Sequence, residues 1–144
     1  MRENSLNKIK VKSLKIFNSP AGKLMHVLKK NELKKWTFGE AYFSIVKFKK
    51  IKAWKYHKKM ILNLTVPFGK VKFVFYSKKN NKFKIIEIGE KKYSRITVPP
   101  KIWFGFMGLS KKPSIILNVA IIKHNSKEVL RIDKKKIIFN WQVK

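Results

Sequence analysis

Cysteine is absent from this chain of 144 residues, which excludes disulfide bonds and thiolate metal sites. Apolar runs of membrane-spanning length are absent as well, and the first residues, MRENSLNKIKVK, lack the continuous apolar stretch of a signal peptide. The motifs GxxxxGK[ST], GxGxxG, GxSxG and HExxH are also missing, so the commonest signatures of nucleotide hydrolysis, dinucleotide binding and serine or zinc hydrolysis are excluded. We therefore expect a cytoplasmic protein that does not cross a membrane.

Acidic residues and arginine are scarce. The chain has 36 Lys+Arg against 7 Asp+Glu, a net charge of +29, and its arginines are Arg2, Arg95 and Arg131. Such a charge ordinarily indicates a nucleic acid or an anionic surface, but binders of phosphate and base edges favour the arginine fork. Lysine is spread along the whole chain together with Ile and Asn, a bias typical of coding sequence rich in A and T. Nucleic acid is therefore not an expected partner, although a polyanion-binding protein remains an alternative.

The hydrophobic pattern is that of β-strands in one domain. VKFVFY (71–76) places Val71, Phe73 and Phe75 on one face, and SIILNVAII (114–122) has the length of a buried strand. The stretch 22–36 could form a helix, but a strand that continues into a loop fits its surroundings better. Turn signals occur at 18–22, 67–69, 77–81, 108–113 and 124–127. We expect an all-β antiparallel sandwich or barrel over residues 1–144, with 1–18 as a basic N-terminal strand or arm.

Two short stretches carry most of the candidate functional residues. IKAWKYHKKM (51–60) sets Trp54, Tyr56 and His57 among lysines, and His57 is the group best able to move protons near neutral pH. It could equally be a solvated histidine at the end of a strand, and His26 and His124 are isolated. VPPKIWFGFMGLS (98–110) is rich in aromatic residues, which could stack on a ligand ring or belong to the core.

The order of motifs resembles the dTDP-4-dehydrorhamnose 3,5-epimerase family over about residues 20–141. The resemblance implies a metal-free cupin, a jelly roll of antiparallel strands that usually forms a homodimer and acts on dTDP-4-keto-6-deoxy sugars for surface polysaccharides such as lipopolysaccharide. The segments that carry it are SPAGKLMHVL (19–28), FGEAYFSIV (38–46), IKAWKYHKKM (51–60), LTVPFGKVKFVFY (64–76), YSRITVPPKIWFGFMGLS (93–110) and LRIDKKKIIFNW (130–141).

The family's catalytic residues are poorly matched. In the RGLHYQ element the histidine is the base, and the matching position here is Lys55, with Lys52 in place of the arginine. The tyrosine acid aligns with Asn118, and the histidine of PPGFAHGF aligns with Phe104. Sugar-nucleotide 3,4-ketoisomerases have RGxHAH instead, and there the second histidine is matched by His57. Since lysine at an HxH position repels a cation, we expect no metal ion, and we expect no cofactor.

These matches predict an isomerase or epimerase-like protein that binds a dTDP-sugar. We expect His57 to carry the proton and Lys55 to stabilise the oxyanion. Lysines would contact the diphosphate, aromatic residues would stack on the base or sugar, and the strand that contains Glu40 would line the cavity. The predicted substrate-binding residues are Lys52, Trp54, Tyr56, Lys59, Glu40, Tyr42, Ser44, Trp103 and Asn118. The alternatives are a catalytically inactive cupin that binds a sugar nucleotide or glycan, and the polyanion-binding protein.

Overall fold

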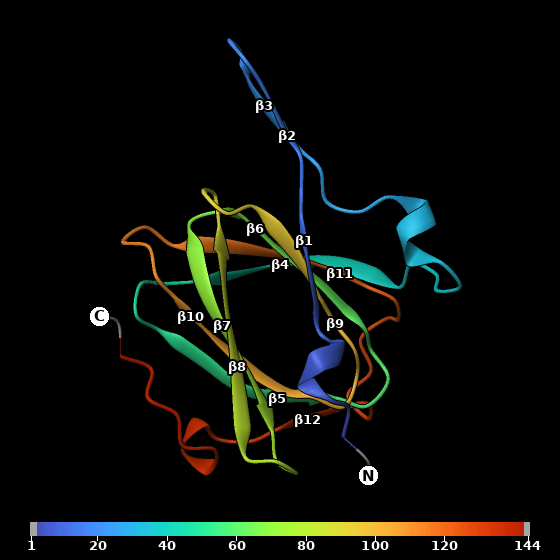
Figure 1. Ribbon diagram of the computed structural model, residues 1–144, viewed down its shortest axis with the longest axis vertical. Helices are drawn as coiled ribbons and strands as arrows, with labels where there is room; N and C mark the ends of the chain where they lie inside the picture. The colour runs from blue at the N-terminus through green and yellow to red at the C-terminus, as the bar shows by residue number, and fades with distance from the viewer. Residues whose placement is uncertain (1–2, 143–144) are drawn as a thin grey trace.

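The computed structural model describes residues 3–142 and consists of two five-stranded antiparallel sheets that face each other (Figure 1). The first sheet has the order β1-β9-β6-β11-β4. Its strands are β1 (Lys10–Ser13), β9 (Ser94–Val98), β6 (Leu62–Phe68), β11 (Ser114–Ala120) and β4 (Glu40–Val46). The second sheet has the order β12-β5-β10-β7-β8. Its strands are β12 (Val129–Arg131), β5 (Ile51–His57), β10 (Trp103–Gly108), β7 (Lys70–Ser77) and β8 (Lys82–Gly89).

The main core fills the space between the two sheets because alternate residues of each strand point inward. Val71, Phe73 and Phe75 are all fully buried there, as their spacing predicts, and Ile116 of β11 packs in the same cluster. SIILNVAII forms β11 as expected. The prediction of an all-β jelly-roll barrel is confirmed.

A second apolar cluster covers the outer face of the second sheet. Val74 and Tyr76 of β7 point away from the main core, because they alternate with Phe73 and Phe75. The C-terminal segment after η3 (Lys134–Lys136) packs on them through Phe139 and Trp141. This segment therefore closes one side of the molecule.

The N-terminal third lies mostly outside the two sheets. After η1 (Leu6–Lys8), β1 pairs with β9 at the edge of the first sheet. The hairpin of β2 (Ile16–Ser19) and β3 (Gly22–Met25) then extends away from the body (Figure 1). The stretch 22–36 contains β3 and a loop with the short η2 (Lys30–Leu33), so it forms a strand that continues into a loop, as predicted.

Candidate active site between the two sheets

A cavity of about 460 Å³ opens between the sheets and is bordered by β4, β11, β6, β5, β10 and β12. Its apolar wall is formed by Leu62, Leu64, Phe104, Phe106 and Ile116. Its polar wall is formed by Tyr42, Ser44, Lys52, Lys55, Asn118 and Arg131. An apolar pocket with a few convergent polar groups is the usual form of a small-molecule site.

A bulge in β5 decides which of its side chains reach this cavity. Phe104 of β10 pairs with Lys55, but the next residue, Gly105, pairs with Ala53, so Trp54 has no partner on β10. Trp54 instead exchanges backbone hydrogen bonds of 3.1 Å with Ile132. Because this extra residue reverses the alternation of the strand, two lysines three positions apart both line the cavity.

The lysines of β5 and Arg131 form a cluster of positive charge in the cavity wall. Arg131 is the partner of Lys55 across the β12–β5 ladder, and the ammonium of Lys52 lies 3.5 Å from the hydroxyl of Ser44. Burial lowers the pKa of Lys55, and the charges of Arg131 and Lys52 lower it further. Three cations that line one small cavity make it a site for an anionic ligand.

A hydrogen-bond network on the opposite wall holds the phenol of Tyr42. The amide of Asn118 donates to the Tyr42 hydroxyl oxygen at 2.9 Å, and its own oxygen accepts from the backbone N–H of Asn63 at 3.0 Å. Thr97 in turn donates to the side chain of Asn63 at 2.9 Å. Since the phenol oxygen already accepts a hydrogen bond, its own proton is free for a group in the cavity. Burial raises the pKa of Tyr42, so the phenol keeps this proton at neutral pH.

His57 is buried and hydrogen-bonded through Nδ1 to the buried carboxylate of Glu128. The other carboxylate oxygen of Glu128 accepts from the backbone N–H groups of Lys59 and Met60 at 3.2 and 3.3 Å. Burial lowers the pKa of His57, although the carboxylate opposes this shift, so the ring is neutral at pH 7. With the proton on Nδ1, Nε2 is an acceptor, and it is buried without a hydrogen-bond partner in the described chain.

Six of the eleven predicted site residues line the cavity, namely Tyr42, Ser44, Lys52, Trp54, Lys55 and Asn118. The other five do not, namely Glu40, Tyr56, His57, Lys59 and Trp103. The ring of His57 stacks on Phe104 at 6.1 Å between centroids, which places it next to the cavity wall. Lys59 borders a separate surface hollow with Glu128.

The aromatic rings expected to stack on the ligand pack outside the cavity, although Trp54 borders it. The indole of Trp54 packs against Trp141 on the outer face of the sheet, and its Nε1 donates to the carbonyls of Lys134 and Ile137 at 3.2 Å. The rings of Tyr56 and Trp103 contact each other 5.0 Å apart, in a cross-strand pair. The structure differs from the expectation here because Trp54 and Tyr56 alternate with Lys55, and Trp103 alternates with Phe104, so these rings lie on the face opposite Lys55.

Glu128 and Arg131 are functional candidates that the sequence motifs did not reveal. Both lie at the C-terminal end of the chain and reach the site only through the pairing of β12 with β5. Arg131 could have been noticed as one of the few arginines, whereas nothing near Glu128 in the sequence distinguishes it. Asp133, which belongs to the segment LRIDKKKIIFNW, caps η3 by accepting from the backbone N–H of Lys135 at 2.9 Å.

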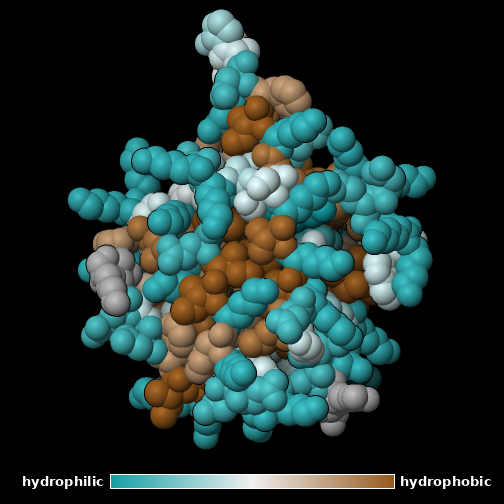
Figure 2. Space-filling model, in the orientation of Figure 1, coloured by the Kyte–Doolittle hydropathy of each residue, from teal (hydrophilic) through white to brown (hydrophobic). Residues whose placement is uncertain are grey.

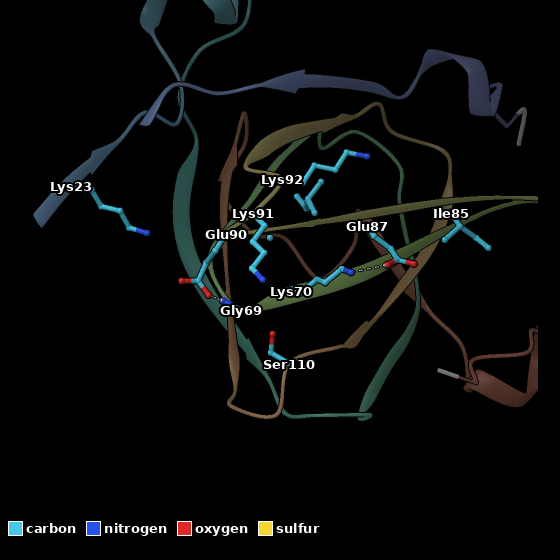
Figure 3. A pocket seen from close by; sticks show the side chains of 11 residues that line it. Lys23, Gly69, Lys70, Ile85, Glu87, Glu90, Lys91, Lys92 and Ser110 are labelled. Atoms are coloured by element: carbon cyan, nitrogen blue, oxygen red, sulfur yellow. Dashed lines mark hydrogen bonds and ion pairs between the residues drawn. The ribbon is translucent and has the colours of Figure 1, made fainter. Parts of the chain in front are cut away.

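A larger hollow of about 960 Å³ lies on the outside of the molecule near β7 and β8 (Figure 3). Its carboxylates are already paired, since Glu87 lies 3.5 Å from the ammonium of Lys70 and Glu90 accepts from the backbone N–H of Gly69 at 2.9 Å. Among the residues that the structure describes, no aromatic side chain lines it. The cavity between the sheets is therefore the better candidate site.

Within residues 3–142 no three side chains of His, Cys, Asp or Glu group closely enough to hold a metal ion. None of the helices described there is long and apolar enough to cross a membrane.

The chain is similar to known proteins in its structure. No family model matches the sequence, and no curated protein sequence matches it. The fold is similar to that of a dTDP-sugar isomerase from Desulfovibrio desulfuricans G20, with 28% identity, a TM-score of 0.85, and coverage of 93% of this chain and 90% of that chain.

Two further solved structures show the same fold at lower identity. A sugar 3,4-ketoisomerase from Thermoanaerobacterium thermosaccharolyticum in complex with TDP is 18% identical, with a TM-score of 0.76 over 92% of this chain and 94% of that one. A dTDP-4-dehydrorhamnose 3,5-epimerase from Bacillus anthracis str. Ames with TDP and PPi bound is 15% identical, with a TM-score of 0.79 over 99% of this chain and 89% of that one. The resemblance that the sequence motifs indicated is confirmed in structure: over most of its length, the chain is similar to dTDP-sugar isomerases and dTDP-4-dehydrorhamnose 3,5-epimerases.

Proposed function

We propose that this protein is a sugar-nucleotide isomerase or epimerase that acts on a dTDP-linked 4-keto-6-deoxy sugar in the synthesis of surface polysaccharide. The observation that carries the proposal is the cavity between the sheets, where Lys52, Lys55 and Arg131 face the phenol of Tyr42. The same fold in other proteins binds dTDP or its sugars. An anionic nucleotide and a keto sugar match the charge and the proton-transfer groups of this cavity.

The diphosphate would bind to the positive wall. Arg131 offers a planar fork of donors that suits phosphate oxygens, and Lys52 adds a second charge beside it. Lys59 borders a different hollow, so any contact of Lys59 with the nucleotide would be made outside the cavity. The apolar rings of Phe104 and Phe106, and not the aromatic residues expected from sequence, are available to contact the sugar or base.

The reaction requires a proton acceptor, a proton donor and a group that stabilises the enolate oxygen. His57 lies beside the cavity wall, against Phe104, and in our proposal the substrate reaches its Nε2 there. Nε2 accepts the proton alpha to the ketone, with Glu128 holding the ring as the Nδ1–H form. Lys55 stabilises the charge that develops on the oxygen. Tyr42 returns a proton, because its hydroxyl is held by Asn118 and its own hydrogen is free.

Deuterium exchange tests the enzymatic function directly. We expect incubation with dTDP-4-keto-6-deoxyglucose in deuterated buffer to introduce deuterium next to the ketone, with a new sugar product visible by NMR. His57→Asn should lower the exchange rate about 100-fold or more, which is the usual contribution of a general base. Absence of both exchange and product would refute turnover of this ketose.

Thermal unfolding with dTDP distinguishes the alternative of an inactive binding protein. A clear dTDP-dependent rise in melting temperature, without exchange and unchanged in His57→Asn, would select that alternative. The polyanion-binding alternative predicts affinity that falls steeply with salt. On the face seen in Figure 2, hydrophilic side chains surround a band of hydrophobic ones, so this face does not offer a continuous hydrophilic surface to a polyanion.

The assembly and location follow from the same proposal. The outer face of the first sheet exposes Phe43 and Ile45 of β4 and Phe68 of β6, with Leu117 of β11 paired to Phe43 between them. An exposed apolar patch of this kind is typical of an interface, and we propose that it joins two copies into a homodimer. A nucleotide-sugar substrate places the protein in the cytoplasm.

A further inference from the structure

Lys55 is an unusual lysine because it is partly buried among other cations. It lines the cavity, with Arg131 as its ladder partner on one side and Phe104 on the other. Among residues 3–142 no carboxylate forms an ion pair with it. The nearest acid with an influence on it, Glu128, is already bonded to His57.

These surroundings make the ammonium of Lys55 easier to deprotonate than an exposed one. Burial lowers the pKa of Lys55 most, Arg131 and Lys52 lower it further, and Glu128 opposes them weakly. An ammonium group can stabilise an oxyanion, whereas a neutral amine cannot do so by charge. A neutral amine is instead a nucleophile, and desolvation beside another cation is a known way to activate lysine toward carbonyl groups.

We propose that the ε-amine of Lys55 forms a protonated imine with the ketone of the bound sugar. The inference rests on the proposed function and deepens it, because it replaces the electrostatic role given to Lys55 above by a covalent role in activating the keto sugar. Once the imine forms and is protonated, its nitrogen carries the positive charge, and this nitrogen is the atom that must accept electrons in the next step. The cavity already brings a proton donor, Tyr42, to the same space.

The steps balance without an added reagent. The Lys55 nitrogen attacks the carbonyl carbon, and the oxygen takes up a proton to give a carbinolamine. Loss of this hydroxyl as water, with a proton supplied by Tyr42, gives the protonated imine. His57 removes the proton on the neighbouring carbon, and the C–H electron pair moves through the C–C bond to neutralise the imine nitrogen as an enamine. Reprotonation at carbon and hydrolysis by one water release the product and the free amine.

Reductive trapping tests the imine on the whole chain. The protein is incubated with dTDP-4-keto-6-deoxyglucose and cyanoborohydride, digested, and mapped by mass spectrometry. We expect the reduced sugar adduct on the peptide that contains Lys55, and we expect excess dTDP to suppress it. Lys55→Met should lose the adduct, whereas Lys82→Met, which changes an exposed lysine of β8 that does not line the cavity, should keep it on Lys55. The variants can differ in stability. The amount of adduct is therefore expressed per folded protein, and the folded fraction is measured by circular dichroism.

Lys55→Arg separates a covalent role from a purely electrostatic one. Arginine keeps a positive charge at this position but cannot form the imine, so we expect deuterium exchange to fall to background. Exchange by the wild-type protein without an adduct on Lys55, or exchange preserved in Lys55→Arg, would overturn the imine and leave the proposed function standing. Absence of exchange and of adduct together would overturn both, and an adduct spread over other lysines and unchanged in Lys55→Met would overturn the imine.

Discussion

Replacement of Glu128 by glutamine tests how the histidine of the site is held. The carboxylate accepts from Nδ1 of His57 and from two backbone N–H groups, and its side chain is only 5% exposed. Glutamine has nearly the same shape, but it offers one oxygen in place of two and turns an NH2 group toward at least one of these donors. Glu128→Gln therefore removes the charge and leaves one or more buried donors without an acceptor.

The magnitude follows from the number of donors affected. A buried donor left without a partner costs about 1–3 kcal/mol, so one such group in Glu128→Gln lowers the free energy of unfolding by about 2 kcal/mol. Glu128→Ala leaves three donors without an acceptor. We expect a loss of about 3–5 kcal/mol, the lower part of the possible range, because Glu128 also borders a surface hollow from which water can enter.

Urea unfolding at neutral pH measures both losses, with Glu90→Gln as the matched control. Glu90 also accepts a backbone N–H, from Gly69 at 2.9 Å, but it is exposed, so its replacement should cost less than about 1 kcal/mol. The reasoning is refuted if Glu128→Gln is no more destabilising than Glu90→Gln. Nitrogen chemical shifts of the His57 ring give a second readout, since Glu128→Gln should reduce the preference for the Nδ1–H form.

Three further predictions concern other parts of the molecule. The pKa of His57 is lowered from 6.5 by burial, so the unfolded chain binds a proton that the folded chain does not; stability is full above pH 6.5 and declines below it, and His57→Asn should flatten this decline in urea midpoints. Arg95 and Lys12 lower the pKa of Glu32 to about 2, so Arg95→Met should raise this pKa toward 4.5 in a carboxyl NMR titration. Lys12 is exposed, so Lys12→Met should raise the pKa of Glu32 less, and a larger rise for Lys12→Met would contradict this ranking. Phe43→Glu should shift the sedimentation coefficient from dimer to monomer, and an unchanged value would exclude the proposed interface.

Much of the fold could be predicted from the sequence because alternation in strands is a local signal. Val71, Phe73 and Phe75 were placed in the core by their spacing, and the turn signals correctly divided the strands. The strand with Tyr42 and Ser44 was also predicted to line the cavity, and both residues do so. Local pattern and motif resemblance together were sufficient for these features.

The remaining parts of the site depend on contacts that no local pattern contains. Alternation alone would put Lys52 and Lys55 on opposite faces, and only the bulge at Trp54 brings them together. The partner of His57 is Glu128, 71 positions later in the chain. Such a pair cannot be predicted from one sequence, because the neighbours of a glutamate in the sequence can be the same lysines whether its side chain is buried or solvated.

The indole of Trp54 has a consequence for how the site is completed. Its N–H reaches carbonyls 80 and 83 positions further along the chain, and these belong to the segment that packs behind the wall of the cavity. During synthesis this wall has no backing until the segment around residue 137 has left the ribosome, so a finished site requires that segment. Ligand binding would therefore report chains that contain it, and shortening the chain before residue 137 should abolish binding while most strands of the barrel can still pair.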